Sequence, residues 1–162
     1  MANIQKGDFE MSEKDFVIPY ELGFTTHFSK TLSESDVYLF AGISGDMNRV
    51  HLNEQYMSTT SLSHRVAHGM LTFSIASAAE TELLNAKFQE MEAEGISYLS
   101  AGYDHVRFIK PVYFGDTLNV SYELIDINND TKKTIGKLTV VNQHGDVVLV
   151  GNHILKFFLK QE

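Results

Sequence analysis

The chain has 162 residues, of which 43% are hydrophobic, with 11 Phe and no Cys. This length and composition favour one folded globular domain that buries a substantial core. The formal net charge of -8 disfavours nonspecific binding to nucleic acid, which needs a basic surface, and the absence of Cys excludes disulfides, cysteine nucleophiles and cysteine-ligated metals.

The N-terminal stretch MANIQKGDFEMSEKDF alternates charge and polarity, and we expect residues 1–20 to form a leader outside the domain. They contain no apolar core of the kind found in signal peptides. The apolar-rich run GMLTFSIASAA is much shorter than the roughly 20 residues that span a bilayer. We therefore expect a cytoplasmic protein without membrane contact, whose single domain covers residues 21–160.

The first predicted elements are a strand and a short helix. Residues 24–30 (FTTHFSK) combine β-branched and aromatic side chains, which is typical of a strand. Ser33 then has the character of a helix N-cap, with Asp36 three residues later and apolar residues following. We expect this helix to end near Gly42.

A longer helix is predicted from Gly69 to Gly95. Its first half is apolar or small on nearly every face, which indicates a buried helix, whereas its second half is amphipathic and acidic. Four strands are then expected at residues 98–110, 116–127, 133–143 and 147–159, with turn residues between them. One strand, a buried helix and four further strands predict an α+β domain in which a long antiparallel sheet wraps one central helix.

Between the two predicted helices lies FAGISGDMNRVHLN, residues 40–53, where polar residues and Gly interrupt the apolar pattern. It places Asp46 and His51 five residues apart. A carboxylate and an imidazole together can hold a water molecule and move its protons. The structural alternative is an Asp that caps a turn beside an ordinary surface His.

Gly69 supplies a third element of possible chemistry at the start of the central helix. The first turn of a helix has unpaired N–H groups, and a ligand can approach a residue without a side chain closely. Such an N–H can stabilise the enolate-like oxygen that forms when a thioester accepts a nucleophile at its β carbon. Spacing alone does not establish that these groups meet.

Segment 40–53 resembles the signature of the MaoC-like, hydratase-2 family of R-specific enoyl-CoA hydratases and dehydratases. VAHGML resembles the family segment that enters the central helix, and FIKPVYFGDTL resembles its strand–turn–strand passage. The similarity covers roughly residues 24–158. The residues that match the signature are Phe40, Ser44, Gly45, Asp46, Asn48, Val50 and His51.

The resemblance implies a single hot-dog domain, with the Asp–His segment as an inserted overhang. It also implies reversible syn addition of water to a trans-2-enoyl thioester of coenzyme A or acyl carrier protein, giving the (R)-3-hydroxyacyl thioester. No cofactor or metal would be needed, and a homodimer or larger assembly is expected. By motif, Asp46 and His51 would activate water and Gly69 N–H would bind the thioester oxygen, with Asn48, Ser77 and Ser44 in supporting roles.

One position departs from the family pattern, because Arg49 stands where the family has Pro. Pro would restrict φ and stiffen the turn between Asp46 and His51. Arg49 could be an ordinary solvated side chain, could pair with Asp46 and blunt it as a base, or could contact substrate phosphate. Arg65, Arg107 and Lys110 are further candidates for phosphate, each with ordinary surface solubility as the alternative.

Other functions follow from the same residues. His64 and His68 stand four apart, a spacing that two helical metal ligands can use, but Arg65 occupies the place of the Glu in HExxH and no metal is predicted. A hot-dog thioesterase that needs only the carboxylate is one alternative function. A non-catalytic acyl-CoA-binding protein, with a site blunted by Arg49, is another.

Overall fold

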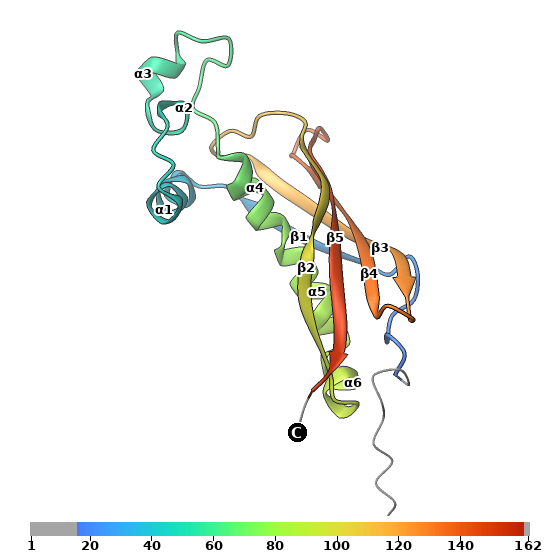
Figure 1. Cartoon of the computed structure of the whole chain (residues 1–162). Helices are drawn as coiled ribbons and strands as arrows, with labels where there is room; N and C mark the ends of the chain where they lie inside the picture. The colour runs from blue at the N-terminus through green and yellow to red at the C-terminus, as the bar shows by residue number, and fades with distance from the viewer. Residues whose placement is uncertain (1–15, 161–162) are drawn as a thin grey trace, which may run out of the picture.

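The computed structural model describes residues 16–160. This part of the chain begins with one strand, continues through a helical region and ends with four consecutive strands (Figure 1). In chain order, the elements are β1 (Thr25–Thr31), α1 (Glu34–Ser44), α2 (Arg49–Leu52), α3 (Glu54–Met57), α4 (Gly69–Ala76), α5 (Ala78–Ala86), α6 (Phe88–Ala93), β2 (Ile96–Phe108), β3 (Thr117–Asn128), β4 (Lys133–Val141) and β5 (Val147–Leu159).

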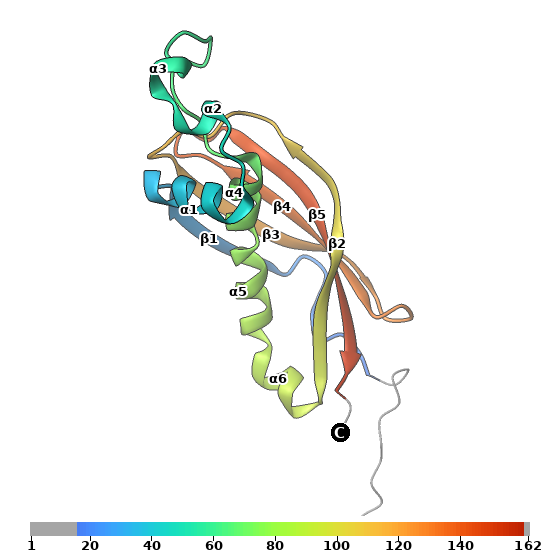
Figure 2. The same ribbon diagram turned by 60° about the vertical axis from the view of Figure 1, so that its left-hand side comes forward.

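The five strands form one antiparallel sheet in the order β1-β3-β4-β5-β2. The sheet curves around α4 and α5, and α1 to α3 project beyond its end (Figures 1 and 2). This confirms the predicted α+β architecture. β3 and β4 bury every second residue along most of their length, as expected for strands with one face on a core.

The core lies between the concave face of the sheet and the central helices. Buried residues of α4 and α5 pack against buried strand residues because both surfaces are apolar. From the helices these are Leu71, Ile75, Ala76, Ala79 and Leu83, and from β3 and β4 they are Leu118, Val120, Tyr122, Leu124, Leu138 and Val140.

The central helix is divided into three, where the sequence predicted one helix from Gly69 to Gly95. Ser77 separates α4 from α5, and Lys87, with φ -120° and ψ 13°, separates α5 from α6. The Ser77 hydroxyl donates to the Ser74 carbonyl at 2.7 Å, and such bonds to the preceding turn bend helices. The first helix also runs further than Gly42, because Gly45, at φ 77°, terminates it.

The expected leader boundary at residue 20 is wrong for the part that the structure describes. Phe16, Ile18 and Tyr20 are buried in the core, and the Tyr20 hydroxyl donates to the Leu83 carbonyl at 3.0 Å. Lys132 Nζ also donates to the Phe16 carbonyl. Residues 1–15 of the expected leader lie outside the described residues. Between residues 16 and 160, no helix has the length and apolarity needed to cross a membrane.

Candidate active site

The segment that carries Asp46 is shaped by side chains bonding to the backbone of neighbouring residues. Ser44 Oγ donates to the Phe40 carbonyl at 2.7 Å and accepts from Asp46 N at 3.2 Å. Asp46 Oδ1 accepts from Asn48 N at 3.2 Å, and Asn48 Oδ1 caps α2 by accepting from Val50 N at 3.1 Å. The structure thus places Ser44 and Asn48 as residues that build the turn carrying Asp46.

The two predicted catalytic side chains face each other. His51 Nδ1 lies 2.7 Å from the Val66 carbonyl, which can only accept, so Nδ1 carries the proton and neutral His51 has a bare Nε2. That Nε2 lies 3.8 Å from Asp46 Oδ2. The two acceptor atoms suit a water molecule that donates one hydrogen to each. The Asp46 side chain is 52% exposed and that of His51 only 12%, so the pair is open on the carboxylate side.

His68 completes this cluster, and the sequence reasoning did not assign it a place there. Its Nε2 lies 2.9 Å from the Asp46 carbonyl, and its ring stacks on that of His51 with 3.7 Å between centroids. The available signal was its position directly before Gly69, at the predicted helix start. His64, the other half of the weighed metal pair, instead lies 2.7 Å from Glu54 Oε1 through Nδ1.

Asp46, His51 and His68 also bring potential metal-ligand atoms within 4.8 Å of one another. The rings of the two histidines are stacked at an interplanar angle of 30°. A ring nitrogen binds a metal with its lone pair in the ring plane, and stacked rings do not converge on one ion. The arrangement therefore fits hydrogen bonding to water better than a metal centre.

Gly69 begins α4 and faces β2 at close range. A Cβ at this position would lie 3.0 Å from the Phe108 ring. The N–H groups of the first turn have no partner within the helix and carry its positive dipole end. Close packing and an available donor therefore coincide at this residue.

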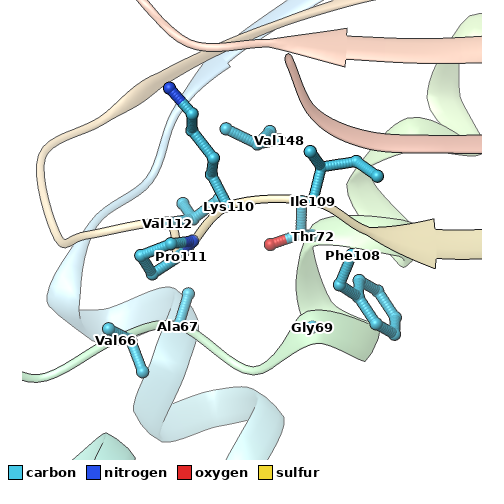
Figure 3. A pocket seen from close by; sticks show the side chains of 10 residues that line it. All are labelled: Val66, Ala67, Gly69, Thr72, Phe108, Ile109, Lys110, Pro111, Val112 and Val148. Carbon is cyan, nitrogen blue, oxygen red and sulfur yellow. The ribbon is translucent and has the colours of Figure 1, made fainter. Parts of the chain in front are cut away.

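A cavity of about 380 Å³ adjoins Gly69 (Figure 3). Its walls are largely apolar, and Lys110 contributes the charged side chain. The wall segment from Val66 to Gly69 also holds His51 through the Val66 carbonyl, so the cavity lies next to the Asp–His pair. The lining residues are Val66, Ala67, Gly69, Thr72, Phe108, Ile109, Lys110, Pro111, Val112 and Val148.

Arg49 is engaged away from Asp46. Its guanidinium lies 3.9 Å from the centroid of the Tyr56 ring, a cation–π contact. The turn that Pro would stiffen is held by the Ser44 and Asn48 hydrogen bonds instead. The structure thus presents Arg49 as a packed side chain that leaves the Asp46 carboxylate open.

Arg65 connects α1 and α3, two of the helices that project beyond the sheet. Its guanidinium pairs with Glu34 at 2.7 Å and Glu54 at 3.3 Å, and it bonds the Tyr38 hydroxyl at 2.9 Å. His64 and then Arg65 lower the pKa of Glu54 to about 2. The candidate role of Arg65 in binding phosphate would require it to leave these partners.

The remaining predicted residues lie apart from the pair. Arg107 donates to the Val106 carbonyl at 2.7 Å, and Lys110 pairs with Asp146 at 2.6 Å while lining the cavity. Ser77 lies at the break between α4 and α5, where its hydroxyl bonds the Ser74 carbonyl. Of the four candidate cations, Lys110 is the one that lines the cavity.

A second polar cluster is buried between α5 and the sheet, and the sequence reasoning missed it. The Glu80 carboxylate accepts from the Tyr103 hydroxyl at 3.0 Å and lies 3.3 Å from His153 Nδ1. Burial raises the pKa of Glu80 to about 7 and lowers that of His153 to about 4. Both groups are therefore disposed to be neutral in the core.

A bulge in the edge strand β2 builds part of this second cluster. The register with β5 shifts between Ser100 and Gly102, so Ser100 and Tyr103 both reach His153. Ser100 Oγ lies 2.9 Å from His153 Nε2, and the Tyr103 ring stacks on His153 with 4.4 Å between centroids. In an unbulged strand, residues three apart point to opposite faces. A bulge of this kind leaves little trace in a hydrophobic pattern.

The sheet wrapped around a helix, with an Asp–His pair on an inserted segment, defines a hot-dog domain with an overhang. The chain belongs to the MaoC like domain family, whose pattern matches residues 19–147.

Curated relatives and solved structures agree with this family. An (R)-specific enoyl-CoA hydratase of Rhodospirillum rubrum is 34% identical over 145 residues, which is 87% of this chain and 93% of that protein. A 3-hydroxybutyryl-CoA dehydratase of Methylorubrum extorquens is 32% identical, covering 88% of this chain and 83% of its own length. The unliganded R-hydratase PhaJ1 from Pseudomonas aeruginosa superimposes with a TM-score of 0.68 at 31% identity, covering 88% of this chain and 84% of PhaJ1.

Proposed function

We propose that this protein is a hydro-lyase that reversibly adds water to a trans-2-enoyl thioester, producing the (R)-3-hydroxyacyl thioester. The observation that carries the proposal is the Asp46–His51 pair, with its two acceptor atoms 3.8 Å apart beside the helix start at Gly69. The family membership and the hydratase and dehydratase names of the relatives support the same reaction.

The pair supplies the proton chemistry in this proposal. A water bridging Asp46 Oδ2 and His51 Nε2 presents its oxygen to the β carbon of the enoyl group. As the C–O bond forms, the pair takes one water proton, and a proton from the pair is delivered to the α carbon on the same face. The net change is addition of H and OH across the double bond, so atoms and charge balance without a cofactor.

Gly69 would stabilise the charge that develops on the thioester oxygen. Its N–H belongs to the unpaired first turn of α4, and a donor fixed there needs no reorganisation during the reaction. The apolar cavity beside it would accommodate an aliphatic arm of the substrate, with Lys110 at the charged part of its wall. The carrier would be coenzyme A or acyl carrier protein.

We also propose that the enzyme acts as a homodimer or larger assembly. α1 and the turn after it expose three apolar side chains spaced four residues apart, Leu39 at 66%, Ile43 at 85% and Met47 at 60%. Large apolar side chains left exposed in one segment are typical of a contact between subunits.

The test is to mix the purified protein with crotonyl-CoA and with a longer trans-2-enoyl-CoA, and to follow the absorbance of the enoyl thioester. We expect the band to decrease and chiral analysis to identify the (R)-3-hydroxyacyl product. Release of free thiol would instead indicate the thioesterase. Binding of acyl-CoA without any turnover, in protein shown to be folded, would indicate a non-catalytic binding protein.

A further inference from the structure

His68 contacts both members of the Asp–His pair from inside the protein. Its side chain is enclosed, with the residue only 2% exposed. Nε2 lies 2.9 Å from the Asp46 carbonyl, and the ring lies against His51 with centroids 3.7 Å apart. The Phe40 ring, 5.1 Å away between centroids, is a further aromatic neighbour.

The hydrogen-bond partners fix the tautomers of both histidines. The Asp46 carbonyl only accepts, so His68 Nε2 carries a proton, and the Val66 carbonyl gives His51 its proton on Nδ1. Neutral His51 therefore turns its bare Nε2 toward Asp46 Oδ2, as a water-binding acceptor must.

We propose that His68 is a positioning residue that sets the backbone of Asp46 and the ring plane of His51, and so holds the water-binding pair in register with Gly69. This inference rests on the proposed hydratase function. His68 is the N-cap of α4, and its own carbonyl accepts from Thr72 N at 3.1 Å. One residue therefore links the pair to the first turn that carries the oxyanion donor.

A purely structural role accounts poorly for an imidazole at this place. His68 Nδ1 is buried and has no hydrogen-bond partner among residues 16–160. It also makes no side-chain cap to the helix that it precedes. An enclosed acceptor without a partner costs stability, so a residue of similar shape without that acceptor would fold at least as well. What the imidazole supplies is a donor to Asp46 together with a flat face for His51.

Two variants separate these contributions. His68→Phe keeps an aromatic face for His51 but removes the donor to the Asp46 carbonyl, whereas His68→Gln keeps an N–H donor but removes the ring. We expect each to lower kcat about tenfold or more while KM stays within about threefold, because an interaction that matters in the transition state is lost. Melting temperatures should stay near that of the wild type. The matched control is His64→Gln, which removes an exposed histidine of the overhang and should leave kcat unchanged.

A double-mutant cycle then tests whether His68 acts through His51. If it does, His68→Gln should cost at least threefold less in a His51→Ala background than in the wild type, because there is no ring left to position. Wild-type kcat in both single variants, or an equal loss in the two backgrounds, would overturn the proposal.

A nitrogen NMR spectrum of the imidazoles provides a readout that does not need turnover. The wild type should show the Nδ1–H tautomer for His51 and the Nε2–H tautomer for His68. In His68→Gln the stacked ring that keeps His51 against the Val66 carbonyl is lost, so His51 should leave that carbonyl part of the time and show a mixture of tautomers. A single unchanged His51 tautomer in that variant contradicts the positioning role. If the wild type hydrates no enoyl thioester, the proposed function fails, while this spectrum still decides the role of His68.

Discussion

The overhang cluster around Asp46 and His51 and the core cluster around Glu80 and His153 each pair a carboxylate with an imidazole, and their surroundings differ sharply. In the overhang cluster, Asp46 faces His51 at 3.8 Å with half of the carboxylate side chain exposed. In the core cluster, Glu80 faces His153 at 3.3 Å with both side chains almost fully enclosed. The residue types are nearly the same, but the overhang cluster is open to water and lies next to the cavity at Gly69, whereas the core cluster is enclosed.

Burial gives the two clusters different chemistry. Desolvation disfavours charge on both Glu80 and His153, and a neutral acid beside a neutral imidazole is a packing element with hydrogen bonds. The Asp46–His51 pair is open on its carboxylate side, so water can reach it from the solvent. Accessibility therefore distinguishes two groupings of similar residue types.

The largest expected effect follows from breaking the overhang cluster. Asp46→Asn and His51→Ala should each fold normally and lose at least about a hundredfold in turnover, the usual scale for acid–base groups. The measurement is initial-rate kinetics on an enoyl-CoA, with circular dichroism to confirm folding. The matched control is Glu80→Gln in the core cluster, which should keep its activity. Near-native rates in both overhang variants would contradict the assignment.

A smaller effect is expected at Gly69. Gly69→Ala keeps the backbone N–H but brings a methyl group within 3.0 Å of the Phe108 ring, so the helix start or the ring must move. We expect kcat/KM to fall about tenfold, because small displacements of a positioned donor are costly. Steady-state kinetics of Gly69→Ala with Phe108→Ala would check the cause. Removing the ring should restore part of the loss, and an undiminished loss in the double variant would rule out this steric explanation.

The titration of Glu80 and His153 in the core cluster should make the free energy of unfolding depend on pH. The pKa of Glu80 rises on folding from 4.5 to about 7, so its contribution to stability is complete below pH 4.5 and is lost as the pH rises through 7. The pKa of His153 falls from 6.5 to about 4, so its contribution is present above pH 6.5 and is lost as the pH falls through 4. Between pH 4.5 and 6.5, a rise in pH therefore weakens the stabilising contribution of Glu80 and strengthens that of His153.

Glu80→Gln removes the pH dependence that Glu80 gives to the free energy of unfolding and leaves the other titrating groups in place. The free energy of unfolding of the variant, minus that of the wild type, should therefore increase from pH 4.5 to 7 and then level off. Urea unfolding of both proteins at several pH values measures this difference directly. A difference that stays flat, or decreases over that range, would show that Glu80 is ionised in the folded protein.

The sequence by itself determined the order of the main elements, and it singled out Asp46 and His51, whose side chains the structure brings to 3.8 Å. Alternating strands and an apolar helix are local patterns, and they predicted the wrapped sheet correctly. The spacing of Asp46, His51 and Gly69 indicated their possible chemistry, because each residue type has a limited set of roles.

Only the tertiary structure decided which other side chains meet. His68 joins the pair through a contact to a residue 22 positions earlier, and Glu80 meets His153 across the core. In the sequence, Arg49 and Arg65 were candidates for binding substrate phosphate. In the structure, Arg49 packs on an aromatic ring and Arg65 pairs with two carboxylates, and these partners are set by packing within the overhang.

The breaks at Ser77 and Lys87 and the burial of Phe16 and Ile18 likewise depend on local hydrogen bonds and long-range packing. Hydrophobic periodicity reports which face of an element is buried, but it carries no information about the partner that covers that face.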